Sequence, residues 1–425
     1  MAKSRKKKKM QAPPSIKRDY EVTKTFFDKF SEVARKTLQL MDMDPGLYDK
    51  FTKKQKIEMM RAKFAAPHFE AKPGHDVPRH YIKLIQKYST EYMEYVCIGN
   101  PDLGLSYYDY LTMGSQFGTF ISAKSKDKQF CEQAEIYKMI ADQVNIYEDF
   151  GDHTLMMPYF EYLRNILGHL SQFNYRMYGF ELVFKETNKR MMFAAFIQIT
   201  SIECKKRSFT FQDKKRPAYR LLMPNFMKPE VTYLNTPRSR VSKDNAPDKL
   251  LNVYIQSHAL FRMKERLDTI NVFERNLYII TSAIMSDVVR LETGRNAFEM
   301  RNIDKNIIGY LPFIVQDDCV IILTILPVSN PATPIGKKLC QTLGVTKAEL
   351  EICGMDKLSY FLTTDFDKIP KLKHALEVND LIYLTNTQSV IEPIENIQRT
   401  PGISATIFKT ERTHEEVLKE IEETY

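Results

Sequence analysis

The apolar pattern changes its period partway along the chain, and this change constrains the fold more than any other feature. Up to about residue 172, apolar side chains recur at three- and four-residue spacing, which indicates amphipathic helices. From residue 179, short runs of β-branched and aromatic residues indicate strands. The sequence therefore predicts an α+β protein. We expect a largely helical N-terminal domain with a small antiparallel sheet, then an α+β domain with helices packed on an antiparallel sheet.

The N-terminal half is predicted to form helices separated by loops. Residues 20–63 predict helix, broken at Asp44-Pro-Gly, and residues 66–78 predict a loop because they carry Pro, Gly and His. Further helices are expected at 79–97, where tyrosines share a stripe, and at 127–148 and 158–172. Four strands then predict an antiparallel meander that closes this domain, at residues 179–185, 190–200, 208–212 and 218–223.

A chain of 425 residues is too long for one ordinary core, so at least two domains are expected. Residues 228–249 are rich in Pro, Asn, Asp, Ser, Lys and Arg, which is typical of a linker. The predicted organisation is a basic disordered tail at 1–18, a helical domain at 19–227, a linker at 228–249 and an α+β domain at 250–425.

The second domain alternates strands and helices. Strands are expected at 251–255, 307–315, 319–326, 358–363, 380–384 and 403–408. Helices are expected at 257–267, 272–285, 334–343 and 365–375, with a last one opening on a capping box at Thr413.

Most of the net charge of +9 lies in the N-terminal tail. Its first 18 residues contain eight basic residues and no acidic residue, so the rest of the chain carries only +1. Such a tail predicts salt-sensitive contact with nucleic acid, and a solubility tail is the alternative. The nucleic-acid-binding candidates in the tail are Lys3, Arg5, Lys6, Lys7, Lys8, Lys9, Lys17 and Arg18.

The sequence favours a cytoplasmic protein with no membrane partner. The basic N-terminus is followed by polar residues, where a signal peptide would have an apolar segment, and no apolar stretch approaches the ~18 residues of a membrane span. The cysteines form no Cys-x-x-Cys pair, so they predict reduced, packed thiols. They are Cys97, Cys131, Cys204, Cys319, Cys340 and Cys353.

The segment around His258 carries the most specific chemical signal. A strand leads to Ser257 as a helix N-cap, and His258 follows in the first turn with Arg262 and Arg266 four and eight residues on. These offsets rotate by about 40° and 80°, so we expect the three side chains along one face. A titratable imidazole and two cations at a helix N-terminus suit RNA cleavage by 2′-OH attack, with His258 moving protons and the arginines holding phosphate. Thr324 joins the site as the polar interruption of an apolar strand.

A resemblance rests on the pattern His-Ala-x-x-Arg-x-x-x-Arg that starts at His258. The order strand, helix, helix, hairpin over residues 250–330 resembles small His-Ala-Arg domains allied to the barnase/RelE-like fold, which are metal-independent ribonucleases and ribosome-linked toxins. The resemblance implies His258 and Arg262 as active-site residues, with Arg266 in support. Two differences stand against it. Residues 286–306 intervene before the hairpin, and such domains are about a quarter of this chain's length.

Two alternatives use fewer assumptions. In the first, the helix is simply a solvated one in which Glu265 pairs with Arg262. In the second, His68, His75 and His80 would bind a metal, but their spacing matches no finger or helical pattern. We therefore expect no metal and no cofactor.

Together these features predict an RNA-directed protein whose C-terminal domain is a metal-independent ribonuclease or an inactive relative of one. RNA would contact the basic tail and the His258 helix. The alternatives are a non-enzymatic module that binds nucleic acid or a nucleoprotein partner, and a structural or assembly component of a phage or mobile element. The sequence does not fix the oligomeric state or the role of the N-terminal domain.

Overall fold

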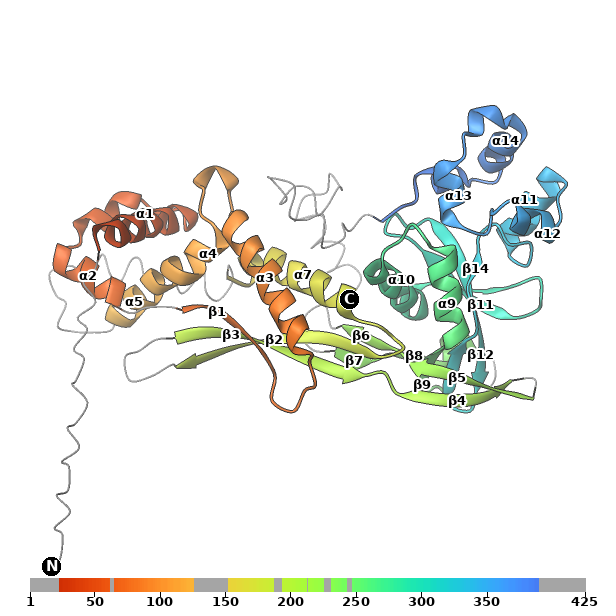
Figure 1. Cartoon of the computed structure of the whole chain (residues 1–425), viewed down its shortest axis with the longest axis horizontal. Coiled ribbons are helices and arrows are strands. Elements are labelled where there is room, and N and C mark those ends of the chain that lie inside the picture. The colour runs from red at the N-terminus through yellow and green to blue at the C-terminus, as the bar shows by residue number, and fades with distance from the viewer. Residues whose placement is uncertain are drawn as a thin grey trace, which may run out of the picture.

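The computed structural model of the chain is an α+β protein, as the sequence predicts. It describes residues 23–61, 65–125, 152–186, 193–211, 213–224, 231–242 and 247–389. Figure 1 shows a small sheet with its helices toward one end and a large sheet with α9 and α10 toward the other. The buried apolar residues form two main clusters, one among residues 30–199 and one among residues 173–384.

The helices of the N-terminal part confirm the expected apolar stripe and the break after it. The first is α1 (Lys24–Leu40), whose Phe30, Val33 and Leu38 are buried. Asp44 then ends the run, because its carboxylate accepts from the backbone N–H of Gly46 at 2.8 Å and caps the 3₁₀ turn η1 (Pro45–Lys50). After η1 comes α2 (Lys53–Arg61).

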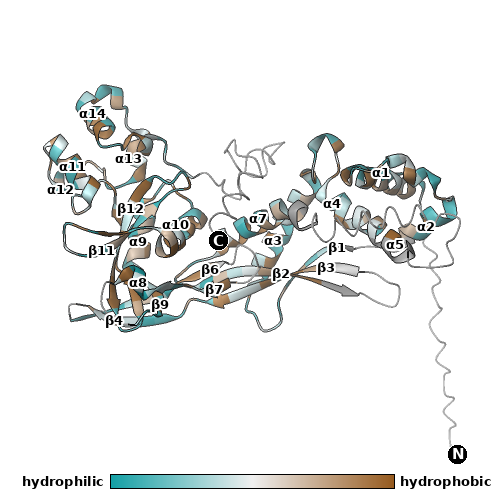
Figure 2. Ribbon diagram, turned by 180° about the vertical axis from the view of Figure 1, so that it is seen from behind, coloured by the Kyte–Doolittle hydropathy of each residue, from teal (hydrophilic) through white to brown (hydrophobic). Residues whose placement is uncertain are grey.

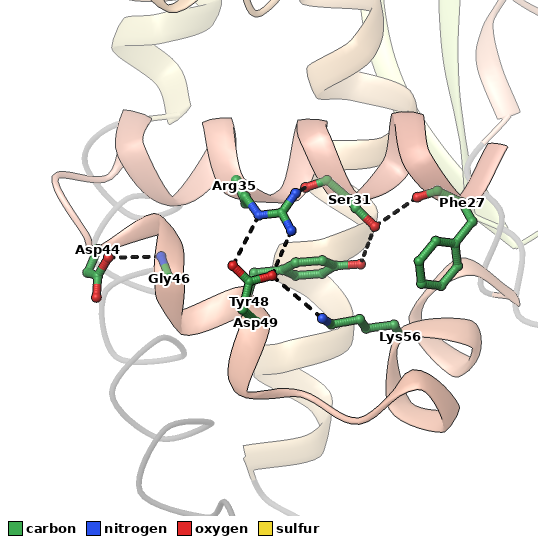
Figure 3. A network of polar contacts seen from close by, with 8 residues as sticks. All are labelled: Phe27, Ser31, Arg35, Asp44, Gly46, Tyr48, Asp49 and Lys56. Carbon is green, nitrogen blue, oxygen red and sulfur yellow. Dashed lines mark hydrogen bonds and ion pairs between the residues drawn. The ribbon is translucent and has the colours of Figure 1, made fainter. Parts of the chain in front are cut away.

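A buried tyrosine holds α1, η1 and α2 together (Figure 3). The Tyr48 ring is fully buried, and the Arg35 guanidinium and Lys56 ammonium lie over it at 5.4 and 4.6 Å from its centroid. Asp49 pairs with both cations, at 2.6 Å from Arg35 and 3.7 Å from Lys56. The hydrogen bond from Arg35 holds the pKa of Asp49 below its usual range. This network is structural.

The next helices confirm the tyrosine stripe as core. In α3 (Arg79–Tyr95), Ile85 and Tyr92 are buried, and Tyr92 stacks on Tyr162 of α7 (Asp152–Leu170) at 4.1 Å between ring centroids. Burial raises the pKa of both tyrosines. Between α3 and α7 lie η2 (Pro101–Leu103), α4 (Tyr107–Asp109), the π-helix η3 (Tyr110–Gly114) and α5 (Ser115–Ser125). The helix predicted at 127–148 lies outside the described residues.

The small sheet has three strands in the order β1-β3-β2. The antiparallel pair β2 (Arg176–Glu186) and β3 (Phe193–Glu203) confirms the predicted hairpin. The third strand, β1 (Ala65–Ala71), pairs parallel to β3 and occupies the segment predicted as a loop. That loop prediction is wrong because the Pro and Gly that suggested it fall mostly after the strand. Phe69 of β1 is buried.

The large sheet has nine strands, and most of its pairs are antiparallel. The order is β10-β11-β12-β13-β9-β5-β4, with β14 beside β12 and β8 beside β9, and the β13–β9 pair is parallel. The bounds are β4 (Lys206–Phe211), β5 (Lys214–Arg220), β8 (Asn235–Pro237), β9 (Leu250–Gln256), β10 (Val288–Arg290), β11 (Asn296–Arg301), β12 (Ile307–Gln316), β13 (Cys319–Ile322) and β14 (Leu326–Pro327).

Two strands pair differently from the predicted meander. The sequence groups β4 and β5 with β2 and β3, but β5 pairs with β9, with Tyr219 opposite Ile255. Alternation identifies a strand but not its partner, since one strand fits any sheet that can bury its apolar face. The β4–β5 hairpin therefore lies at an edge of the large sheet (Figure 1).

The segment predicted as a linker contains ordered elements at residues 231–242. They are β7 (Val231–Tyr233), which pairs with β6 (Leu222–Pro224), then β8 and α8 (Arg238–Val241). Val231, Leu234 and Val241 join the larger core cluster. Arg240 donates hydrogen bonds to backbone carbonyls of Ser282 and Ala283. Arg240, one of the polar residues that suggested a linker, thus binds the backbone of α10.

Two helices that pack on the large sheet lie where the sequence predicts them, at 257–267 and 272–285. They are α9 (Ser257–Arg266) and α10 (Val272–Met285), which begins with Asn271 accepting from the N–H of Glu274 at 2.9 Å. Ile279, Ile280 and Ala283 of α10 are buried in the core cluster of the sheet.

The C-terminal elements mix confirmed and wrong predictions. The helix α11 (Pro334–Leu343) is confirmed, and α12 (Lys347–Ile352) and α14 (Pro370–Val378) are also helical. The strand predicted at 358–363 is the helix α13 (Leu358–Thr363), and the one at 380–384 is replaced by the 3₁₀ turn η7 (Ile382–Asn386). Residues 366–368 of the helix predicted at 365–375 form a separate turn, η6 (Phe366–Lys368). The elements predicted beyond residue 400 lie outside the described residues.

Among the described residues, the structure contains no helix with the length and apolar character that crossing a membrane requires. The five described cysteines are free thiols, and Cys131 lies outside the described residues. Burial raises the pKa of the Cys204 thiol to about 12.

Candidate nucleic-acid interface

The site predicted around His258 lies where β9 ends and α9 begins. Gln256 is the N-cap of α9 and Ser257 is its first residue, so the predicted Ser257 cap is displaced by one position. The Ser257 hydroxyl instead donates to the carbonyl of Pro217 in β5 at 3.4 Å, which connects the start of α9 to the β4–β5 hairpin. Ala259 and Met263 are buried against the sheet.

The exposed face of α9 contains His258 and Arg262 but not Arg266. The His258 side chain is exposed. Arg262 is half-buried and pairs with Glu265 at 2.7 Å, the pairing that the solvated-helix alternative requires. Arg266 is only 8% exposed. The expectation of one shared face fails at Arg266 because a rotation of about 80° turns it toward the core.

Arg266 and Thr324 meet at a backbone carbonyl. Arg266 donates to the carbonyl oxygen of Ile325, and its Nε lies 3.8 Å from Asp356. The half-buried Thr324 hydroxyl donates to the same carbonyl at 3.5 Å. The structure therefore brings Arg266 and Thr324 together at the carbonyl of Ile325. There Arg266 contacts this carbonyl and Asp356 of the protein itself. Burial lowers the pKa of the Arg266 guanidinium.

The environment of His258 is cationic. Partial burial is the largest cause that lowers the pKa of His258 below its usual value. The positive charges of Arg262, Arg216 and Arg266 lower it further, and the negative charge of Glu265 raises it. Arg216 comes from β5 and was not among the predicted residues. The cations that lower this pKa repel one another, and a bound phosphate would offset that repulsion.

The hairpin β4–β5 carries the charge that sequence reasoning missed. Residues 205–220 contain seven basic residues and only one acidic residue, Asp213. The signal was available as a local charge run, but it was hidden because acidic residues elsewhere reduce the charge beyond the tail to +1. The far end of the hairpin extends beyond β9, since β5 pairs with β9 only from Ala218 to Arg220 (Figure 2).

Most hairpin cations have no carboxylate partner among the described residues. Within that part of the chain, no Asp or Glu forms an ion pair with Lys206, Lys214, Lys215 or Arg216. Arg207 differs, since it lies 4.0 Å from Asp317 and 3.9 Å from Asp318. The hairpin cations lie on both of its sides, because successive strand residues alternate. We refer to them together with two residues of α9 as the basic face: Lys206, Arg207, Lys214, Lys215, Arg216, His258 and Arg262.

Aromatic rings alternate with these cations. The Arg207 guanidinium lies over Phe209 at 4.9 Å from the ring centroid. Two guanidinium groups lie over Phe211, Arg216 at 5.9 Å and Arg295 at 5.4 Å. Arg295 follows the turn between β10 and β11, so the opposite edge of the sheet also contributes a cation.

The remaining predicted candidates are separate from the basic face. The eight basic residues of the tail lie outside the described residues. His75 bonds to the backbone of Ser201 through Nδ1, while His68 and His80 make edge contacts with Phe196 and Tyr81. In the described ranges, no group of three His, Cys, Asp or Glu side chains is placed to hold a metal ion.

No protein-family model matches the sequence, and comparisons with curated proteins and with solved structures find no significant match. The resemblance of residues 250–330 to the barnase/RelE-like domains therefore stays a prediction. The strand, the two helices and the later hairpin on which it rests are present as β9, α9, α10 and β12–β13.

Proposed function

We propose that this chain is a non-enzymatic nucleic-acid-binding protein that contacts its ligand through the basic face. The observation that carries this proposal is a set of cations on one hairpin, Lys206, Lys214, Lys215 and Arg216, that form no ion pair among the described residues. Cations without a carboxylate partner repel one another. A polyanion neutralises them and releases counterions, which is the main source of nucleic-acid affinity.

The arrangement fits an extended polyanion better than a small anion. Successive residues of β4 alternate between the two sides of the hairpin, so Lys206 and Arg207 face opposite ways, and the lysines at its far end lie beyond the rest of the sheet. A small anion would need two or three donors converging on one point. A phosphate backbone instead takes one contact from each of several cations in a row.

The experiment compares two charge-matched double variants of the full chain. In Lys214→Glu/Lys215→Glu, binding of a fluorescent RNA strand at about 50 mM salt should weaken by about tenfold or more and become less dependent on salt. Lys53→Glu/Lys54→Glu changes the same charge on exposed residues of α2, at the other end of the molecule (Figure 1), and should change binding little. An equal decrease in both variants would show only a net-charge effect and would overturn the proposal.

A second candidate is metal-independent RNA cleavage, favoured by the exposed His258 beside Arg216 and Arg262. The His258 imidazole would accept the 2′-hydroxyl proton as the 2′-oxygen bonds to phosphorus and the bond from phosphorus to the 5′-oxygen breaks. The imidazolium would then return the proton to the leaving 5′-oxygen, while the two guanidinium groups hold the phosphate. Arg216 would then take the place that the sequence gives to Arg266. Purified protein should cleave structured RNA in EDTA, and His258→Ala should lower the rate by about 10²–10⁴-fold. Equal cleavage by wild type and variant would mean contamination and would reject this candidate.

A further inference from the structure

A large aromatic side chain is exposed on α9 close to His258 and Arg262 of the basic face. Phe261 is 62% exposed, although it lies in α9 between His258 and Arg262. At about 100° per residue, these three side chains fall within an arc of about 100° on the helix. The opposite side of α9 is buried through Ala259 and Met263, so Phe261 takes no part in the core.

Phe261 differs from the other rings near these cations. Phe209 and Phe211 are each covered by guanidinium groups. Phe261 makes no ring–ring or cation–ring contact within the described part of the chain. Exposed apolar residues occur elsewhere, Ile352 among them, so exposure alone indicates nothing. What distinguishes Phe261 is an uncovered ring on the exposed side of α9, next in sequence to Arg262 and one helical turn from His258.

We infer that Phe261 stacks on an unpaired base, so that the basic face takes single-stranded rather than duplex nucleic acid. This inference rests on the proposed function. The flanking His258, Arg262 and Arg216 would hold phosphates of the same strand while the ring covers one base. A base in a duplex is stacked between its neighbours and cannot offer its face, whereas a base in a single strand can. Stacking on a Phe ring is tolerant of sequence, because every base has a π-face.

The test uses the full chain and two RNA probes of about twelve nucleotides, one single-stranded and one fully paired. Phe261→Ala should weaken single-strand binding by about 5- to 150-fold, the usual effect of removing one base-stacking ring, and leave duplex binding unchanged. Phe261→Tyr keeps an aromatic ring and should restore single-strand binding. Tyr95→Ala removes another aromatic residue exposed on a helix, 83% exposed on α3, and should change neither affinity. A strand of DNA tests whether the 2′-hydroxyl matters.

A second measurement reports stacking itself. A 2-aminopurine placed in the single strand should be quenched on binding to the wild type and not to Phe261→Ala. If Phe261→Ala weakens both probes equally, or neither, the stacking inference is wrong, while weaker binding of both probes by Lys214→Glu/Lys215→Glu would still support the proposed function. If the wild type binds neither probe, the proposed function fails and the inference fails with it.

Discussion

Three residues four positions apart on α9 have three different environments, although the sequence places them in one motif. His258 is exposed, Arg262 is half-buried with Glu265, and Arg266 is buried against Ile325 and Asp356. The sequence identifies the residue types correctly for an anion site. It cannot show that Arg266 faces the core, because this depends on the packing of α9 against residues about 60 positions later.

The buried and the exposed arginine should therefore respond differently to truncation. Arg266→Ala should lower the free energy of unfolding by about 1–3 kcal/mol, because the carbonyl of Ile325 loses its charged donor and keeps only the long bond from Thr324, and Asp356 loses its cationic neighbour. Arg262→Ala removes a surface pair and should change it by about 0.5 kcal/mol or less. Urea denaturation of both variants measures the difference. Equal small effects would mean that Arg266 does not have a structural role.

The low pKa of His258 predicts that binding takes up a proton. The pKa lies below the usual value in the free protein, because of burial and because of Arg262, Arg216 and Arg266. A phosphate beside the ring raises the pKa, so between the two values the complex holds more protons than the free protein. Affinity should therefore rise as pH falls through this window, by at most about tenfold per pH unit for one proton. His258→Gln should abolish the rise in binding titrations from pH 8 to pH 5.5, and an unchanged pH profile would contradict this.

At the scale of elements, the sequence predicts those whose local signals agree. The helices α10 and α11 and the hairpin β12–β13 are confirmed because capping residues, periodicity and turn residues indicate the same structure there. Leu358 and Phe361 show the opposite case. Their run is apolar enough for a strand, but both are buried from one side of a helix at three-residue spacing. Near residue 380, Asp380 adopts a positive φ of 54°, a conformation that Asp tolerates, so the chain turns where the sequence predicts the strand 380–384 to begin.

Close packing of two helices gives a test at this scale. A Cβ added to Gly168 of α7 would lie 1.9 Å from the Phe273 ring of α10, and nearby Asn276 donates to the Ser171 carbonyl at 3.2 Å. Gly168→Ala should therefore lower the free energy of unfolding by about 1–3 kcal/mol through overpacking. Phe273→Ala makes room for the methyl group. Gly168→Ala should therefore cost less free energy of unfolding in a Phe273→Ala background than in the wild type. A fully additive double variant would show that the two helices do not pack here.

For the whole molecule, the sequence predicts the fold class and misses how the chain is divided among sheets. Residues 206–220 form the edge hairpin of the large sheet, although composition marks them as part of a separate meander. In the segment predicted as a linker, β8 joins this sheet, and Val231, Leu234 and Val241 join its core. Of the candidate site, the α9 residues are predictable from their motif. Arg216 and Arg295 are not, because only the folded sheet brings them to α9 and to Phe211.

The tail and the basic face should contribute separately to binding. Replacing Lys6, Lys7, Lys8 and Lys9 by Gln should reduce the slope of log affinity against log salt by up to about 0.7 for each single-strand phosphate that the tail no longer neutralises. It should leave the preference for single-stranded over duplex RNA unchanged, because that preference is assigned to Phe261. Binding titrations at several salt concentrations measure both quantities. A tail variant that no longer prefers single strands would place recognition in the tail.

The central claim is that nucleic acid contacts the β4–β5 hairpin and α9, and photo-crosslinking tests it most directly. A single-stranded RNA that contains 4-thiouridine is bound to the full chain, irradiated and digested, and the crosslinked peptides are identified by mass spectrometry. The account predicts crosslinks within residues 205–220 and 257–266, and their disappearance from the second segment in Phe261→Ala. Crosslinks confined to residues 1–18, or spread evenly over the surface, would contradict it.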